Sequence, residues 1–169
     1  MQLDTDGDMN TDGGVKTAPG SRGFALSLKG RALRLLSARE QSRAELERKL
    51  APHADTPEQL VQVLDDLQAR DFISETRVIE SVINRRQAKL GASRIRRELL
   101  GKGLGAEVVT EAMGELKATE LERATEVWRK KFDGTATDAS GRAKQMRFLA
   151  ARGFGSDVIC RVVSQAGED

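Results

Sequence analysis

Aromatic residues, cysteine and histidine are all scarce in this chain of 169 residues. Aromatics make up 4% of it, and tyrosine is absent. An apolar core built from Leu, Val, Ile and Ala suits packed helices better than a sandwich of sheets. The only cysteine is Cys160, which excludes a disulfide framework and is typical of a protein in a reducing compartment.

The scarcity of nucleophiles and metal ligands argues against catalysis. His53 and Cys160 are the only residues of their types, so the chain offers neither a zinc cluster nor a pair of cysteines. We expect His53, next to Pro52, to be an exposed loop residue and Cys160 to lie in the core of an apolar helix. The sequence therefore predicts a protein that is not an enzyme and has no catalytic residue, metal or cofactor.

Long apolar runs are also missing. No run approaches the roughly 18 residues that a membrane-spanning helix requires. The N-terminal segment is acidic and has no apolar stretch typical of a secretory signal. Residues 1–24 are rich in Asp, Gly and Thr, which predicts a disordered acidic tail. These features favour a cytoplasmic protein.

From Leu26 onward the chain carries helical patterns in place of strand patterns. Ser42 followed by Glu45 is a capping box that predicts a helix start, and Thr56 followed by Pro57 predicts another. Apolar residues recur at helical spacing after each start. Trp128 is spaced from its apolar neighbours as a packing residue would be.

The helical pattern occurs three times. The stripe of Leu60, Leu64 and Leu67 returns 49 residues later as Val109, Met113 and Leu116, and segment 99–109 matches segment 149–159 at a shift of 50. In the latter pair, Gly103 and Gly153 are expected to close helices in the left-handed conformation, and Leu104 and Phe154 to fill the following corner. A period near 50 residues indicates tandem stacked units.

We therefore predict an all-α protein of three tandem three-helix repeats in an extended, curved array. The expected limits of the repeats are residues 25–73, 74–118 and 119–166.

Several segments resemble the RecX family, whose members regulate the recombinase RecA. The resemblance covers about residues 26–165 and is carried by 31–40, 42–50, 63–67 with 72–75, 91–103, and 152–159. The sequence differs from the family pattern at Asp71, where Gly is usual, at Ser74, where Asp is common, and at Val78, where an aromatic is expected. The first two changes fall at a turn and at a helix N-cap, where Ser serves as well as Asp.

The resemblance implies a function. Proteins of this family bind along the helical RecA filament on single-stranded DNA, span neighbouring protomers, and suppress ATP hydrolysis, filament growth and strand exchange. It implies a monomeric regulator of DNA recombination and repair that acts in the DNA-damage (SOS) response by protein–protein contact.

Basic residues gather in the second and third repeats, where a filament-binding surface would need them. Segment 85–102 contains seven basic residues and one acid, Glu98, and segment 142–152 contains four basic residues and no acid. Such a surface suits an acidic protein face or DNA phosphates. The candidate partner-binding residues are Arg85, Arg86, Lys89, Arg94, Arg96, Arg97, Lys102, Arg142, Lys144, Arg147 and Arg152.

A second interpretation stays open at this point. The second and third helices of each repeat, joined by a short glycine turn, roughly mimic a helix-turn-helix, which would bind DNA directly. Weak, nonspecific contact with DNA is compatible with either interpretation.

Overall fold

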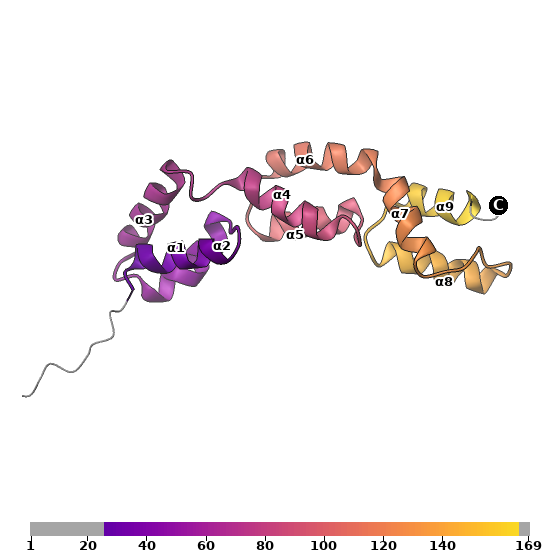
Figure 1. The fold of residues 1–169 in the computed structure, drawn as a ribbon, viewed down its shortest axis with the longest axis horizontal. Coiled ribbons are helices and arrows are strands. Elements are labelled where there is room, and N and C mark those ends of the chain that lie inside the picture. Colours follow the sequence, from indigo (N-terminus) through magenta and orange to yellow (C-terminus); the bar gives the residue numbers. More distant parts are fainter. Residues whose placement is uncertain (1–25, 166–169) are drawn as a thin grey trace, which may run out of the picture.

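The computed structural model describes residues 26–165, and within that range the chain forms helices and turns with no strand (Figure 1). The expected disordered tail, residues 1–24, lies outside the described residues. The first unit consists of α1 (Leu28–Ala38), α2 (Arg43–Leu50) and α3 (Pro57–Ala69), with a short 3-10 helix at Ala51–His53. The second consists of α4 (Glu75–Arg86), α5 (Ala92–Gly101) and α6 (Ala106–Ala118). The third consists of α7 (Glu120–Arg129), α8 (Ala139–Ala150) and α9 (Ser156–Gln165).

Helix starts follow the expected cap chemistry. The Ser42 hydroxyl accepts a hydrogen bond from the Glu45 N–H, and the Glu45 carboxylate accepts one from the Ser42 N–H, which completes a capping box at α2. At α3, the Thr56 hydroxyl accepts from the Gln59 N–H, and Pro57 occupies the first turn.

Each unit has its own hydrophobic core. Leu60, Leu64 and Leu67 lie in the first core, and Val109, Met113 and Leu116 in the second. The third core contains Trp128, Leu149 and Ile159, with the Trp128 and Phe132 ring centroids 6.1 Å apart. The expected apolar stripes and the packing role of Trp128 are confirmed.

The helix-closing turns also match the repeat. Gly103 and Gly153 have φ angles of 77° and 84°, in the left-handed region. Leu104 and Phe154, which follow them, are buried. Asp71, where the family usually has Gly, closes α3 with a φ of 59°.

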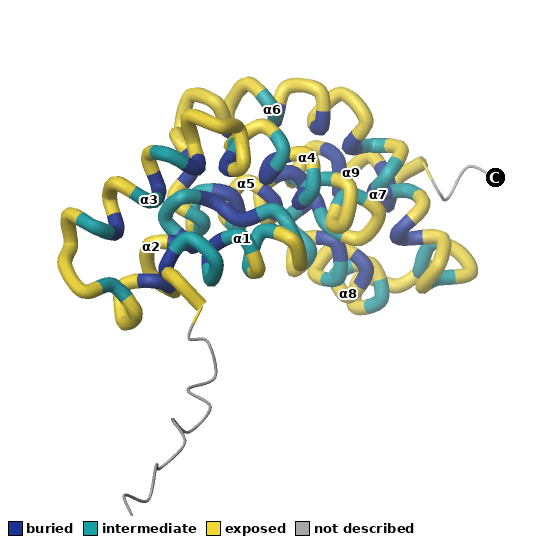
Figure 2. Tube along the Cα trace, turned by 60° about the vertical axis from the view of Figure 1, so that its left-hand side comes forward, coloured by how far each residue is buried: buried dark blue, intermediate teal, exposed yellow. Residues whose placement is uncertain are grey.

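The three units follow one another along an elongated molecule. Figure 1 shows α6 along its upper edge and α5 and α8 along its lower edge, and Figure 2 shows the units arranged as an arch with α6 near the crest. The predicted fold class, an all-α array of three-helix repeats, is confirmed.

The prediction for Cys160 is wrong, because its side chain is exposed. α9 is the last helix of the described array and buries Val158, Ile159, Val162 and Val163. Cys160 lies outside this buried face, at a groove between α8 and α9 that Met146 and Val163 also line. His53 is exposed, as expected.

Candidate partner-binding surface

The second helices of the units contact one another end to end. The turn after α5 packs on the start of α2, where the Ser42 hydroxyl donates to the Lys102 carbonyl at 2.5 Å. The same turn brings Gly103 so close to α2 that an added Cβ would lie 2.6 Å from the Ala44 Cβ. Glycine at 103 is therefore required both by its φ and by this contact.

We call this contact between the turn after α5 and the start of α2 the first joint. An ion pair adds to it. Lys102 Nζ lies 2.8 Å from Glu45 Oε1, and the exposed fractions of the two side chains are 15% and 8%. Burial alone would raise the pKa of Glu45. Hydrogen bonds from Arg39, Lys102 and the Ser42 N–H outweigh burial and lower that pKa to about 2. The carboxylate stays ionised inside the joint.

The second joint repeats the arrangement between α8 and α5. The Gly91 N–H donates to the Arg152 carbonyl at 2.9 Å, and Arg94 Nη1 donates to the Ala151 carbonyl at 2.6 Å. A Cβ at Gly91 would overlap the Gly153 carbonyl. Glu120, from α7, accepts from the Ala92 N–H at 2.9 Å and so caps α5, whose own N-cap residue Gly91 has no side chain.

These joints involve two of the predicted partner-binding residues. The Lys102 ammonium donates to the Glu45 carboxylate and the Arg94 guanidinium to the Ala151 carbonyl, so both side chains connect neighbouring units. This use was not foreseeable from the local sequence, because the contacting residues lie 57 positions apart.

Four more predicted residues make contacts within their own unit. Arg86 pairs with Glu98 at 3.0 Å, and Arg85 Nε donates to the Ser81 carbonyl of its own helix. The remaining two are Arg142, which donates to the Thr137 carbonyl, and Arg152, whose guanidinium lies 3.7 Å from the centre of the Phe148 ring.

The other five predicted residues are exposed, and their side chains donate no hydrogen bond to, and form no ion pair with, any residue between 26 and 165. Four of them lie on α5 and α8, and we call these the basic row: Arg96, Arg97, Lys144 and Arg147. The fifth is Lys89, which follows α4.

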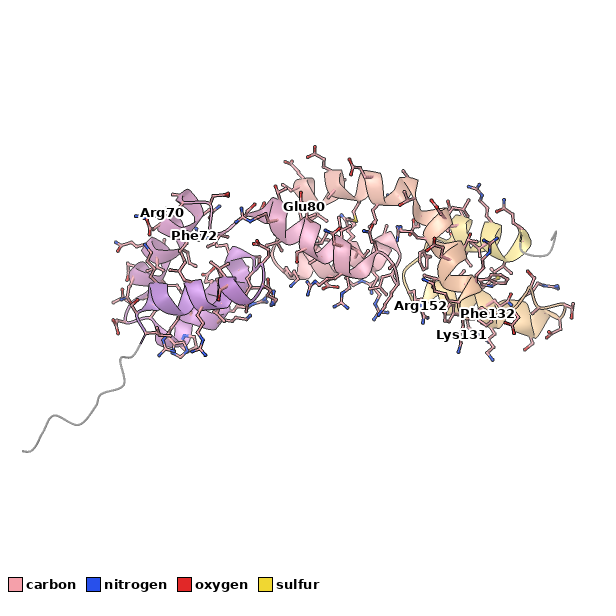
Figure 3. The ribbon with its side chains drawn as sticks, viewed as in Figure 1. Arg70, Phe72, Glu80, Lys131, Phe132 and Arg152 are labelled. Carbon is pink, nitrogen blue, oxygen red and sulfur yellow. The ribbon has the colours of Figure 1, made fainter. Side chains whose placement is uncertain are left out.

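Lys89 lines a groove between the second and third units, of about 290 Å³. We call it the junction groove. Its cationic lining is Lys89, Lys130, Lys131 and Arg152, and its apolar lining is Ala88, Val127 and Phe148. Figure 3 shows Lys131, Phe132 and Arg152 near one another on the lower side of the third unit. Among the described residues no carboxylate lines the groove, so it suits an anionic group.

The sequence analysis missed Lys130 and Lys131. The run Arg129-Lys130-Lys131 at the end of α7 was the available signal, but its relation to Lys89 depends on how the two units pack.

Charge is distributed unevenly on the second unit. A groove between α4 and α6 carries Glu80, Glu111 and Glu115 beside apolar residues. Figure 3 shows Glu80 on the upper side of this unit, away from Lys131 and Arg152. Anionic partners are therefore favoured at the junction groove over the groove between α4 and α6.

Residues 26–165 contain no cluster of His, Cys, Asp and Glu suited to hold a metal ion. None of the helices in that range is long and apolar enough to cross a membrane.

Comparisons with known proteins agree on one family. Residues 118–163 match the domain family described as RecX, third three-helix domain. The chain is 55% identical over 144 residues to the regulatory protein RecX of Leptothrix cholodnii, covering 85% of this chain and 92% of that protein. It is 51% identical over 134 residues to the regulatory protein RecX of Herminiimonas arsenicoxydans, covering 79% and 89%. The crystal structure of RecX from Lactobacillus salivarius shares the fold, with a TM-score of 0.69 at 20% identity over 82% of this chain and 94% of that one.

Proposed function

The chain belongs to the RecX family of regulatory proteins, and on this premise we propose that it binds along the RecA filament on single-stranded DNA and restrains it. It suppresses RecA ATP hydrolysis, filament growth and strand exchange, and so limits recombination during DNA repair and the SOS response. It acts in the cytoplasm as a monomer, by contact and without a cofactor or catalysis of its own.

The end-to-end contact of the second helices is the observation that carries this proposal. α2, α5 and α8 have 8, 10 and 12 residues. At 1.5 Å per residue they supply roughly 45 Å of helix, not counting the turns. A surface of that length suits a polymer with repeating subunits better than a small ligand.

The basic row and the junction groove supply the chemistry of the contact. Their cations are available to an acidic face of RecA or to phosphates of the bound strand. Arg94 and Lys102 support the contact indirectly, by holding the units in line.

The helix-turn-helix alternative is less well supported. In that motif the start of the second helix of the pair contacts base edges in the major groove. Here α6 carries Glu107 in its first turn and exposed Glu111 and Glu115 beyond it, and α9 carries Asp157 in its first turn. Carboxylates at those positions repel DNA phosphates, so direct binding to naked duplex should be weak and nonspecific.

Steady-state ATP hydrolysis by RecA on single-stranded DNA tests the proposal. Wild-type protein should inhibit hydrolysis, and Arg96→Glu/Arg97→Glu should need about tenfold more protein for half inhibition, which corresponds to about 1.4 kcal/mol of binding. Lys117→Glu/Arg161→Glu, which reverses two exposed charges on α6 and α9, outside the second helices and the junction groove, is the matched control.

Two outcomes would contradict the proposal at different levels. Unchanged hydrolysis with wild-type protein at every concentration rejects the function. Equal inhibition by the basic-row variant, the control and wild type rejects the assignment of the surface. Tight, sequence-dependent binding to duplex in the absence of RecA would favour the helix-turn-helix alternative.

A further inference from the structure

The first unit has a groove of its own, of about 430 Å³, between α1 and the end of α2. We call it the first-unit groove. Arg31, Arg34, Lys49 and His53 line it, and Leu35 and Leu50 supply apolar surface. It lies far along the array from the junction groove, at the end where the described chain begins (Figure 1).

The cations of this groove are not neutralised by the residues that the structure describes. The guanidinium groups of Arg31 and Arg34 donate no hydrogen bond and form no ion pair with residues 26–165, and Lys49 Nζ donates to the neutral Gln41 side-chain amide oxygen. No carboxylate from residues 26–165 lines the groove. Elsewhere in the unit, by contrast, Lys29 pairs with Asp66 and Arg43 pairs with Asp65. The groove therefore concentrates positive charge that residues 26–165 leave unpaired, beside an apolar floor.

The segment that precedes the groove has the opposite charge. Leu26, the first described residue, lines the groove and is 46% exposed, so the described chain begins at the edge of the groove. The preceding residues include Asp4, Asp6, Asp8 and Asp12, with no basic residue before Lys16. The 14 residues from Asp12 to Leu26 span up to about 50 Å when extended, so the acidic segment can reach back to the groove. Tethering of this kind gives an effective concentration of about millimolar.

We propose that the acidic segment 4–12 binds in the first-unit groove of its own chain. Its carboxylates face Arg31, Arg34 and Lys49, and the contact is mainly electrostatic, because the only large apolar side chain in the segment is that of Met9. The segment then competes with any other anionic partner for this groove. The proposal does not depend on RecA, so it can fail or succeed separately from the proposed function.

His53 makes the contact directly measurable, because the only histidine of the chain lines the groove. Its ring C–H signals in a proton NMR spectrum are therefore unambiguous. In full-length Cys160→Ser protein, a nitroxide attached to Asn10→Cys should broaden these signals, and reduction of the nitroxide should restore them. The broadening should disappear in about 1 M salt, where the Debye length is about 3 Å.

Charge variants of the same labelled protein test the stated chemistry. Asp4→Asn/Asp6→Asn/Asp8→Asn/Asp12→Asn should lose most of the broadening, as should Arg31→Gln/Arg34→Gln. Arg96→Gln/Arg97→Gln removes two charges from the basic row and should retain it. Circular dichroism of each variant verifies that its helices are intact.

Three outcomes would overturn the proposal. His53 signals that are indifferent to the nitroxide at low salt exclude the contact. Broadening that persists in both the Asp→Asn variant and the Arg31→Gln/Arg34→Gln variant excludes an electrostatic contact between the segment and the groove. Broadening that disappears when the labelled protein is diluted assigns the groove to a segment of a second copy of the chain, because a contact within one molecule does not depend on protein concentration.

Discussion

At the joint between the first and second units, the Glu45 carboxylate accepts hydrogen bonds from Arg39, Lys102 and the Ser42 N–H. Because these donors favour the charged form, the pKa of Glu45 falls from 4.5 to about 2. A carboxyl group with a lowered pKa in the folded state contributes stability above its unfolded pKa. That contribution is lost as the pH falls from about 4.5 to about 2.

Glu45→Gln should therefore reduce the free energy of unfolding at neutral pH by about 2–3 kcal/mol. The difference from wild type should shrink as the pH approaches 2. Urea unfolding at a series of pH values measures this, with Glu47→Gln, at an exposed position of the same helix, as the control. A difference that stays constant between pH 2 and 6 would contradict the ionised state assigned to Glu45.

Two glycines give opposite expectations for substitution by alanine. Gly103→Ala places a Cβ at a φ of 77° and 2.6 Å from the Ala44 Cβ, so it should destabilise the protein by about 1–3 kcal/mol. Gly114 lies within α6 with open space around it, so Gly114→Ala should stabilise by about 0.5–1 kcal/mol. Thermal unfolding compares the two, and effects of the same sign would refute the distinction.

At the level of single residues, the sequence was most informative where the cause is local. Ser42 and Thr56 cap helices and Gly153 closes one within a single turn of the chain, so these roles were predictable from neighbouring residues. The contacts of Ser42 and Gly153 with the neighbouring unit were not. Lys102 and Arg94 could not be assigned to joints, because their partners lie 57 positions away. The basic row stays a prediction as a binding surface.

Among the helices, α5 depends most on its neighbours. The turn after α8 contacts the start of α5, and the turn after α5 contacts the start of α2. Its N-cap is Gly91, and the capping carboxylate comes from Glu120 of α7, which is 7% exposed. A cap supplied by another unit links the formation of α5 to the presence of the third unit.

Glu120→Ala should cost about 1–2 kcal/mol, the value of a lost N-cap. The Ala92 amide should exchange its hydrogen faster, because it loses its acceptor. Glu122→Ala, at an exposed position of the same first turn, is the control and should leave exchange at Ala92 unchanged. Equal exchange in both variants would show that Glu120 does not cap α5.

The prediction that Cys160 is buried was wrong for a reason that also lies at the level of the helices. Periodicity identifies the apolar face of a helix but not how many neighbours cover it. α9 buries one face and, among the described residues, has no following unit against the other. Terminal helices of an array are therefore the least predictable from pattern alone.

Over the whole molecule, contacts join each unit to its neighbour and leave the first and third units apart (Figure 1). Stability in such an array is close to a sum of unit and joint contributions. The limits 25–73, 74–118 and 119–166 stay a prediction for domains that fold as separate units.

Lys102→Met should therefore act mainly on the first joint. It removes one of the cations that face buried Glu45 while Arg39 remains, so we expect a loss of about 2 kcal/mol. Hydrogen exchange should accelerate in α2 and change little in α9. Arg48→Met, at an exposed position of α2, is the control. Uniform acceleration from α1 to α9 would instead indicate a single cooperative unit.

The buried indole of Trp128 has a practical consequence. It is the only tryptophan of a chain without tyrosine, its N–H has no partner among the described residues, and it packs against Phe132 in the third unit. Intrinsic tryptophan fluorescence therefore reports on the third unit alone. A denaturation curve followed by fluorescence records the melting of that unit, and only a second probe at the other end of the array reveals whether the molecule comes apart all at once.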